Sequence, residues 1–430
     1  MKYVIDKDLV HTVMKEKQIS TQTELAKKIG VSKNQLSVIL SSRSNPIKSN
    51  YQKLCDVLEI EPLDILVPAK QQIKTTKNQT EPVSEKFVDT DIVVPRKKYS
   101  SVELFAGAGG LALGLEMAGF DAKGLVEYDR HAAATLRANR PNWNVIEEDI
   151  VHVSKNSIKT YIKGSDTVDF ISGGYPCQAF SYAGHKLGLD DVRGTMFYHF
   201  ASIVEELKPK VFLAENVKGL TTHDSGKTLQ TMIDIFEKMG YIVTWNLLKA
   251  NDYGVAQKRE RVVIVGVRDD LKIEYRLPKP YDYKPVLRDV LKDVPTSIGE
   301  KYPDKKRKVL ELVPAGGYWR DLPKAVAMEY MGKSYYSGGG RTGMARRISW
   351  DEPCLTLTCS PAQKQTERCH PEETRPFTVR EYARIQSFPD TWKFSGSMSQ
   401  QYKQIGNAVP VEFARAIGLS IIDLLNRIDD

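Results

Sequence analysis

The sequence predicts an α/β protein with a doubly wound, mostly parallel sheet, a smaller irregular, strand-rich domain and an N-terminal all-α domain. Two observations support the sheet: apolar runs alternate with helical segments from Tyr99 onward, and polar residues follow the ends of these runs. A third observation, two capped helical segments joined near Gly30, predicts the N-terminal domain. With 430 residues, the chain is long enough for two or three domains.

Residues 1–68 have the pattern of a compact helical domain. Thr21 with Glu24 forms a capping box, and Ser32 with Gln35 forms another at the next helix start. Two short helices joined at 30–32 predict a helix-turn-helix. The segment resembles the phage-repressor-like helix-turn-helix family, in which the start of the second helix contacts base edges. The side chains expected to contact DNA are Lys33, Asn34, Gln35, Ser37 and Arg43. The alternative is a helical protein-interaction domain.

A linker and then the α/β pattern follow. Residues 69–98 lack periodicity and are rich in Lys, Gln, Thr and Glu, which predicts a linker. Buried strands are expected at 102–105, 123–126, 168–171, 211–214 and 262–267. Helices are expected at 110–117, 129–137 and 411–426, and from near Gly194 and Ser225. The sheet domain therefore comprises 99–268 plus 405–430, and frequent Pro and Gly at 269–404 predict the separate irregular domain.

Composition excludes several classes of protein. Hydrophobic residues make up 41%, and no apolar stretch approaches the ~20 residues that span a membrane. The N-terminus lacks the apolar core of a secretion signal, and five cysteines predict free thiols in a reducing compartment, here the cytoplasm. A net charge of +8 favours polyanionic partners. Cys359, Cys369 and His370 lack a fourth ligand at regular spacing, so no metal site is expected.

The first strand ends in a glycine-rich turn, F-A-G-A-G-G at 105–110. Glycines let a ligand approach the backbone and expose a helix N-terminus. The spacing differs from G-x-G-x-x-G, which argues against a nicotinamide cofactor. Glu127 is placed to bind ribose hydroxyls, Tyr128 to stack on an adenine, and Asp149 to accept from the adenine amino group. Together they indicate an adenosine-bearing cofactor without requiring a phosphate.

A thiol and a carboxyl group follow two other strands. The turn Gly174-Tyr175-Pro176-Cys177 presents a cysteine behind a proline, which limits backbone freedom before it. Glu215 ends a separate strand, so both groups fall at the same edge of the sheet. This pair suits attack on a ring carbon with proton transfer to a ring nitrogen. The alternatives are an inert buried cysteine and an acid that caps a helix.

Two arginines alternate in an extended segment before the last strand. Arg259 and Arg261 are therefore expected to point to one face, toward the same pocket. They could neutralise a phosphate or hold a carbonyl oxygen. The alternative is a solvated run of charges.

These pieces, in this order, resemble the DNA (cytosine-5) methyltransferases over most of residues 100–415. The resemblance rests on Phe105-x-Gly107-x-Gly109-Gly110, Gly174-Tyr175-Pro176-Cys177-Gln178, Glu215-Asn216-Val217, Gln257-x-Arg259-x-Arg261, Gln404-x-Gly406-Asn407-Ala408-Val409-Pro410 and the penultimate block at 347–358. It implies a Rossmann-like catalytic domain that depends on S-adenosylmethionine. It also implies that the irregular domain at 269–404 recognises the target.

The resemblance assigns a role to each block. Cofactor-binding positions would be Phe105, Gly107, Gly109, Gly110, Glu127, Tyr128, Asp149, Ile150, Pro176, Met196, Asn407 and Val409. Cys177 would add to carbon 6 of a cytosine flipped out of duplex DNA, and Glu215 would bond ring nitrogen 3. Arg259 would bond the ring carbonyl oxygen, and Arg261 would support the site. Further DNA contacts are expected from Gln178, Ser181, Gly339, Gly340, Arg341 and Thr342.

The resemblance also implies a biological setting. The protein would be a bacterial modification enzyme that protects DNA from a cognate restriction endonuclease, monomeric as an enzyme and dimeric on promoter DNA. Residues 314–347 look like target regions for short GC-rich palindromes such as GGNCC. The N-terminal domain, which the chemistry does not need, is expected to repress its own system.

Two alternative functions stay open. One is a transcription factor on an inactive scaffold, against which the intact Cys177, Glu215 and Arg259 argue. The other is an RNA cytosine-5 methyltransferase, against which the long target region and the second DNA-binding domain argue.

Overall fold

The chain forms two compact units, Met1–Glu81 and Pro82–Asp430. The computed structural model describes residues 3–5, 7–19, 21–31, 36, 40, 51–60, 66–68, 86–162, 167–176, 195–336 and 342–430.

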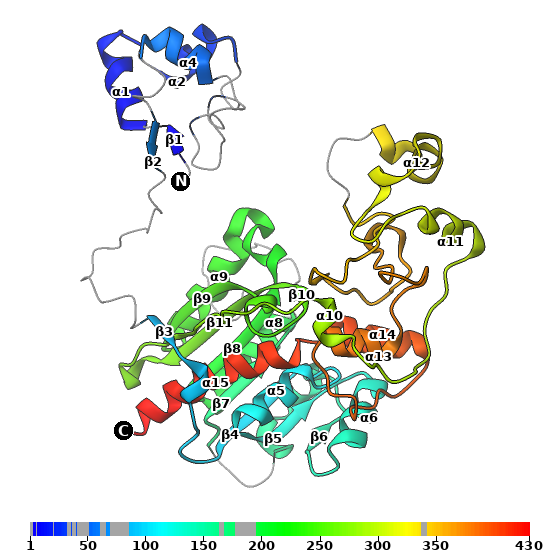
Figure 1. The fold of residues 1–430 in the computed structure, drawn as a ribbon. Helices are drawn as coiled ribbons and strands as arrows, with labels where there is room; N and C mark the ends of the chain where they lie inside the picture. The colour runs from blue at the N-terminus through cyan, green and yellow to red at the C-terminus, as the bar shows by residue number, and fades with distance from the viewer. Residues whose placement is uncertain are drawn as a thin grey trace. The chain divides into compact units, whose positions relative to one another are not determined.

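The N-terminal unit is a small helical domain closed by a pair of strands (Figure 1). Its described elements are α1 (Lys7–Glu16), α2 (Gln22–Lys28), α4 (Tyr51–Leu58) and the antiparallel strands β1 (Tyr3–Ile5) and β2 (Leu66–Pro68). Thr21 caps α2 as predicted, because its hydroxyl accepts a hydrogen bond from the Glu24 backbone N–H at 3.2 Å. Leu25, Leu36 and Leu54 are fully buried in its core. Positions 33–35, 37 and 43, which are expected to contact DNA, lie outside the described residues.

A seven-stranded sheet forms the centre of the second unit, in the order β6-β5-β4-β7-β8-β11-β9 (Figure 1). Its strands are β4 (Tyr99–Leu104), β5 (Phe120–Val126), β6 (Val145–Ile146), β7 (Phe170–Gly173), β8 (Val211–Val217), β9 (Tyr241–Lys249) and β11 (Glu260–Arg268). Neighbours from β6 to β8 are parallel, whereas β11 is antiparallel to both β8 and β9. The predicted mostly parallel sheet is confirmed. The edge strand β9 is an addition that the sequence prediction omitted.

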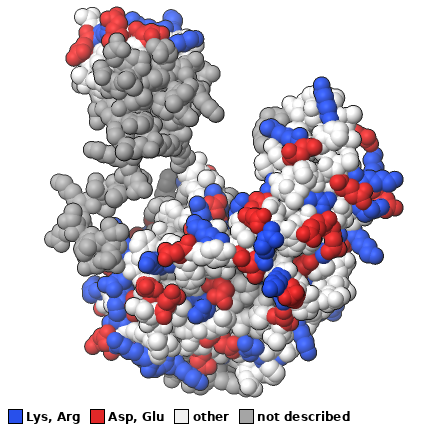
Figure 2. Space-filling view, viewed as in Figure 1, with Lys and Arg blue, Asp and Glu red and all other residues white. Residues whose placement is uncertain are grey.

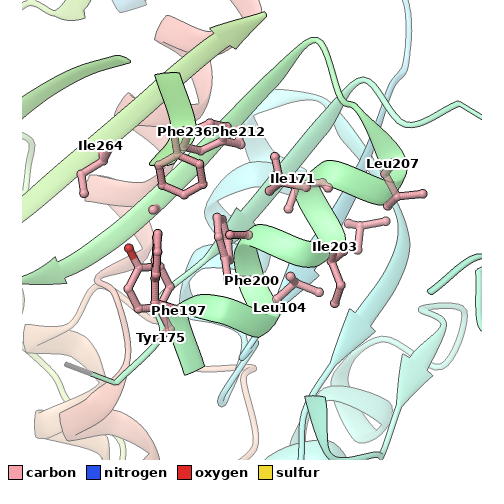
Figure 3. Close-up of a cluster of buried hydrophobic side chains, with 14 of the residues drawn as sticks. Leu104, Ile171, Tyr175, Phe197, Phe200, Ile203, Leu207, Phe212, Phe236 and Ile264 are labelled. Carbon is pink, nitrogen blue, oxygen red and sulfur yellow. The ribbon is translucent and has the colours of Figure 1, made fainter. Parts of the chain in front are cut away.

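Helices cover both faces of this sheet, as a doubly wound fold requires. One face carries α7 (Ile150–Lys155), α8 (Met196–Leu207) and α9 (Lys227–Lys238), and the other carries α5 (Gly110–Ala118), α6 (Arg130–Asn139) and α15 (Val411–Ile428). On the first face, the rings of Phe212 and Phe236 lie 4.2 Å apart, and the ring of Tyr175 lies 5.3 Å from Phe200 (Figure 3). Tyr175 thereby anchors the turn after β7 in the core.

The predicted linker at 69–98 differs from the structure in its second part. β3 (Phe87–Val88) pairs in parallel with β12 (Leu277–Pro278), and Val88 is buried. The Arg96 backbone N–H donates to the Asn426 side chain of α15 at 3.1 Å. Backbone pairing therefore joins residues 86–98 to the second unit, although their composition is that of a linker.

The region at 269–404 is irregular, as predicted, but helical rather than strand-rich. Its described helices are α10 (Leu287–Val290), α11 (Asp304–Glu311), α12 (Lys324–Met331), α13 (Val379–Ile385) and α14 (Met398–Asn407). Its described strands β12 and β13 (Cys354–Leu355) have two residues each, and β13 pairs with β10 (Gln257–Lys258). Pro303 and Pro323 directly precede α11 and α12, where a missing N–H costs no helical hydrogen bond. The prolines here start helices, and Lys, Glu, Ala and Met continue them.

This region divides into two parts. One core cluster surrounds Tyr302, Trp319 and Cys369 and lies within residues 302–369. We call this cluster the recognition core, after the target recognition that the sequence leads us to expect of this region. In contrast, α13 and α14 share a separate cluster with Leu113 of α5 and Val411 of α15. Residues 377–404 therefore pack on the sheet domain, on the other side of the predicted boundary at 404.

Charged residues of both signs are interspersed over the visible face of the second unit (Figure 2). The net charge of +8 is therefore not gathered into one patch on that face. Within the described ranges, we find no helix long and apolar enough to cross a membrane.

Candidate active site

A cavity of about 700 Å³ opens at the carboxyl ends of β4, β5, β7 and β8. Its walls come from the turns after these strands, from the start of β11, and from residues 357–359 and 403–409. Ligands of open parallel sheets bind at this edge, and the volume lies in the range of small-molecule sites. The cavity has two halves, one around the turn at 105–110 and the other around Glu215.

The turn at 105–110 has an unusual backbone. Phe105, Gly107 and Gly109 have φ angles of 60°, 56° and 85°. Glycine adopts this left-handed conformation at no steric cost, whereas Phe105 adopts it with local strain. The Ala106 N–H donates to the Val126 carbonyl at 3.0 Å, which ties the turn to β5. All residues of this turn except Gly109 line the cavity.

The helix that follows this turn packs unusually close to the C-terminal segment. A Cβ on Gly110 would lie 2.1 Å from the Val409 carbonyl oxygen, and one on Gly114 would lie 2.5 Å from that of Val411. Only glycine permits this approach, which brings Asn407 and Val409 into the cavity wall. The segment 407–409 and the glycine turn thus form one continuous surface.

Glu127, at the end of β5, is tied to the glycine turn. Its Oε2 accepts from the Gly107 N–H at 2.6 Å, and its Oε1 accepts from the Asp129 N–H at 2.6 Å. Burial raises the pKa of Glu127, and these two backbone hydrogen bonds oppose that rise. Each carboxylate oxygen has a further lone pair. Because Glu127 lines the cavity, it can still accept hydrogen bonds from ligand hydroxyls.

Glu103 of β4 is a cavity residue that the sequence prediction missed. It is 3% exposed, and its Oε2 has no hydrogen-bond partner among the residues that the structure describes. Burial, followed by the charge of Glu127, raises the pKa of Glu103 well above its usual value. Its position inside a strand gave no sequence signal, because it interrupts an apolar run without any motif.

The second half of the cavity contains a buried ion pair. Arg261 lies opposite Val217 in the antiparallel register of β11 and β8, and its Nε is 2.8 Å from Glu215 Oε1. A Cβ on Gly174 would lie 2.9 Å from the other carboxylate oxygen, Oε2. Arg261 therefore fixes one oxygen of Glu215, while the other faces the turn that leads to Cys177.

Arg259 lies in the same half and is 2% exposed. Its guanidinium donates to the carbonyl oxygens of Gly406 at 3.2 Å and Asn407 at 3.4 Å, the last two residues of α14. Its Nε has no partner within the described part of the chain. Burial, followed by the charge of Arg261, lowers the pKa of Arg259, while Glu215 opposes this change. Arginine nevertheless keeps its charge at neutral pH.

The turn after β7 is held by the residue that follows Glu215. The Asn216 side-chain amide donates to the Tyr175 carbonyl at 3.0 Å, and Pro176 lines the cavity. Cys177, Gln178 and Ser181 lie outside the described residues.

Two family models match this chain. The model described as C-5 cytosine-specific DNA methylase matches residues 99–423. The chain belongs to this family of enzymes. The model of the Cro/C1-type HTH DNA-binding domain matches residues 10–71, which agrees with the predicted helix-turn-helix.

Relatives support the family assignment of this methylase. Type II methyltransferase M.Sau96I of Staphylococcus aureus is 55% identical over 98% of this chain and 99% of its own length. Type II methyltransferase M.Eco47II of Escherichia coli is 57% identical over 77% of this chain and 80% of its own length. The similarity to M.Sau96I thus extends through the N-terminal unit.

Solved structures agree on the fold. An Escherichia coli prophage protein described as a DNA modification methyltransferase matches with a TM-score of 0.57 and 27% identity, covering 76% of this chain and all of that one. Spodoptera frugiperda DNMT2 matches with a TM-score of 0.55 and 19% identity, covering 77% of this chain and all of that one. The second likeness shows the fold alone.

Several predicted positions of the methylase do not line the cavity. Gly109, Tyr128, Asp149, Ile150 and Met196 are absent from its walls. Tyr128 is 75% exposed, and Asp149 caps α7 by accepting from the Val151 N–H at 2.8 Å. Ile150 lies in the core cluster on the sheet face that carries α7, α8 and α9, and Met196 packs against that cluster. Among the predicted recognition residues, Thr342 is exposed, whereas Gly339, Gly340 and Arg341 lie outside the described part of the chain.

Polar side chains that were not predicted for the site, Cys359, Lys403 and Asp129 among them, also line the cavity. Cys359 donates to the Asn407 Oδ1 at 2.9 Å, and burial raises its pKa while Arg259 and Lys403 oppose that rise. Lys403 pairs with Asp129 at 2.9 Å across the rim. Cys359 and Asn407 are 48 residues apart, so spacing gives no sign of their contact.

Proposed function

We propose that this methylase is the modification enzyme of a type II restriction–modification system. It transfers a methyl group from S-adenosylmethionine to carbon 5 of a cytosine that is flipped out of a short duplex DNA site. The observation that carries this proposal is one cavity lined both by the glycine turn with Glu127 and by the cluster of Glu215, Arg259 and Arg261. The type II methyltransferases similar to this chain support it.

The first half of the cavity fits an adenosine-bearing cofactor. Glu127 has free lone pairs for ribose hydroxyls, and the turn at 105–110 leaves room for close approach to its backbone. Phe105, Pro176 and Asn407 would complete this part of the site. When bound, S-adenosylmethionine supplies the methyl group that carbon 5 receives.

The second half fits the cytosine ring. The Cys177 thiolate attacks carbon 6, while Glu215 holds a proton at ring nitrogen 3 and the electron pair moves to carbon 5. Arg261 occupies Oε1 of Glu215, which leaves Oε2 for the ring. Arg259 donates to the ring carbonyl oxygen. After carbon 5 receives the methyl group, a base removes its proton and the bond to Cys177 breaks, which restores the ring and the thiolate.

The target is proposed to be a short GC-rich palindrome such as GGNCC, read by the recognition core and the residues beside it. This specificity rests on the resemblance of residues 314–347 to the target regions of such enzymes. Bisulfite sequencing of DNA from an expressing host identifies the protected cytosine. A protected site that is neither palindromic nor GC-rich would contradict this part of the proposal.

The N-terminal unit is proposed to bind the promoter of its own system and repress it. It forms a compact unit of its own, and the Cro/C1-type HTH DNA-binding model matches its residues 10–71. A mobility-shift assay with promoter DNA compares the full chain with a chain lacking residues 1–81. Loss of the shift with retained methyl transfer supports repression, and an unchanged shift contradicts it.

The catalytic proposal is tested by labelled methyl transfer to duplex DNA and to transfer RNA. We expect label in duplex DNA alone, lost in Cys177→Ser and retained in Cys55→Ser, a matched change in the N-terminal core. Label in RNA would favour an RNA methyltransferase, and no label in either would favour an inactive scaffold. We further propose that the enzyme is cytoplasmic and that it methylates DNA as a monomer and binds promoter DNA as a dimer. Its methylation would protect DNA from a cognate restriction endonuclease.

A further inference from the structure

The glycine turn is held from behind by a tryptophan that follows α13. The Trp392 indole Nε1 donates to the Ala108 carbonyl oxygen at 3.1 Å, and Trp392 is 1% exposed. A Cβ on Gly109 would lie 3.0 Å from the indole ring, so the ring and the turn are in direct contact. Ala108 itself lines the cavity, whereas Trp392 does not. The indole therefore supports the cavity wall without reaching a ligand.

The direction of this N–H is fixed by hydrogen bonds on both sides of the tryptophan. The Lys393 N–H donates to Asn139 Oδ1 at 2.8 Å, and Asn139 Nδ2 donates back to the Lys393 carbonyl at 2.7 Å. Arg380 donates to the Trp392 carbonyl at 2.8 Å. The Arg140 guanidinium lies 5.3 Å from the centre of the indole ring. The segment is thus clamped to the end of α6, and the indole has little freedom to turn.

The turn needs such support because its conformation is costly. Phe105 is strained, and glycines at 107 and 109 are as stable in other conformations. In the described part of the chain, backbone groups of Ala106, Gly107 and Gly109 make hydrogen bonds, and the indole N–H donates to the Ala108 carbonyl. A buried carbonyl without a donor costs about as much free energy as a lost hydrogen bond. Removing the indole N–H therefore favours other shapes of the turn.

We propose that Trp392 is a positioning residue for cofactor binding. Its indole N–H holds the turn at 105–110 in the shape that accepts the cofactor. The inference rests on the proposed binding of S-adenosylmethionine at this turn. Trp392 also connects the segment after α13 with the half of the cavity around the turn at 105–110, which we call the cofactor half. The same segment is hydrogen-bonded to the end of α6 through Lys393 and Asn139.

The test is a calorimetric titration with S-adenosylhomocysteine, which binds without turnover. Trp392→Phe keeps a buried ring but removes the N–H, so we expect a dissociation constant about 5- to 20-fold higher. At saturating S-adenosylmethionine, the turnover number should stay close to that of the wild type, because Cys177, Glu215 and Arg259 are untouched. A purely structural role would instead lower the melting temperature without changing the dissociation constant.

A matched control removes the indole N–H of a different buried tryptophan. The Trp319 Nε1 of the recognition core is buried and has no partner among the described residues. Trp319→Phe should leave the dissociation constant unchanged. An equal loss of affinity in Trp319→Phe would overturn the inference, as would wild-type affinity in Trp392→Phe.

A second variant keeps the inference testable if Trp392→Phe fails to fold. Asn139→Ala releases the clamp on Lys393 without touching the indole, and we expect about 2- to 5-fold weaker binding. If Trp392→Phe does not fold, wild-type affinity in Asn139→Ala overturns the inference. Absence of binding by the wild type would overturn the proposed cofactor, and the inference with it.

Discussion

The two halves of the cavity are built from different chemical groups. The cofactor half is built around the turn at 105–110, whose backbone is left-handed at 105, 107 and 109, and around Glu127, which is tied to two backbone N–H groups. The half around Glu215, which we call the base half after the cytosine base it is proposed to hold, consists of charged side chains. These are Arg259 and the ion pair of Glu215 with Arg261 at 2.8 Å. Ligand binding in the cofactor half is therefore expected to depend on backbone shape, and ligand binding in the base half on charge.

This difference determines how each half fails. An added methyl group should disrupt the cofactor half, because its elements touch through glycines. A neutralised charge should disrupt the base half while the backbone stays in place. The predictions below separate the two effects by measuring cofactor affinity and methyl transfer on the same variants.

The largest effect is expected from Glu215→Gln. The amide preserves the shape but cannot exchange a proton with ring nitrogen 3, so methyl transfer should fall about 10²- to 10⁴-fold. The affinity for S-adenosylhomocysteine should be unchanged. Glu260→Gln is the matched control. Glu260 forms an ion pair with Lys218 at the surface, and removing the charge of Glu260 should leave methyl transfer intact. A similar loss of cofactor affinity in Glu215→Gln would contradict the claim that the two halves of the cavity act separately.

Gly110→Ala should break the other half. The new methyl group would lie 2.1 Å from the Val409 carbonyl oxygen, so α5 or the segment at 407–409 must move. We expect weaker cofactor binding and a loss of about 1–3 kcal/mol in the free energy of unfolding, measured by denaturant titration.

Gly219→Ala is the matched control for this change. Among the residues that the structure describes, a Cβ at Gly219 would meet only Val217, at 3.9 Å, and the backbone there has no positive φ. We expect wild-type stability and cofactor affinity. Wild-type behaviour in Gly110→Ala as well would show that close packing does not shape the cofactor half.

The smallest effect is a pH dependence of stability that arises from Glu103. Burial, with the charge of Glu127, raises the pKa of Glu103 in the folded state. The folded protein then holds a proton that the unfolded chain releases, so stability is lost as pH rises from the unfolded pKa through the folded one. Glu103→Gln removes this loss. The free energy of unfolding of Glu103→Gln minus that of the wild type should therefore be larger, meaning a more stable variant, at pH 8 than at pH 5. An equal difference at both values would contradict the assignment.

Local patterns account for most of the fold and for the base half. The strands at 102–105, 211–214 and 262–267 follow from apolar runs, and their ends carry Glu215 and Arg261, which the structure brings together. The strand β9 was missed although aromatic and β-branched residues follow Gly240. In the irregular region, prolines predicted breaks, but they start α11 and α12 instead.

Contacts between distant segments could not be predicted from the sequence. Trp392 and Ala108 are 284 residues apart, and Cys359 and Asn407 are joined only because α14 returns to the sheet domain. Glu103 carries no motif at all. Such residues depend on packing, which periodicity and spacing do not encode.

The central claim is that both halves of the cavity serve one reaction at carbon 5 of a cytosine, with Cys177 as the attacking group. A duplex that carries fluorine at carbon 5 of the target cytosine tests it directly, because fluorine cannot leave as a cation and the final step stops. With S-adenosylmethionine present, the wild type should form an adduct with DNA that survives denaturation and that peptide mass spectrometry maps to Cys177. An adduct at another residue, or none from enzyme that methylates the unmodified duplex, would contradict the account.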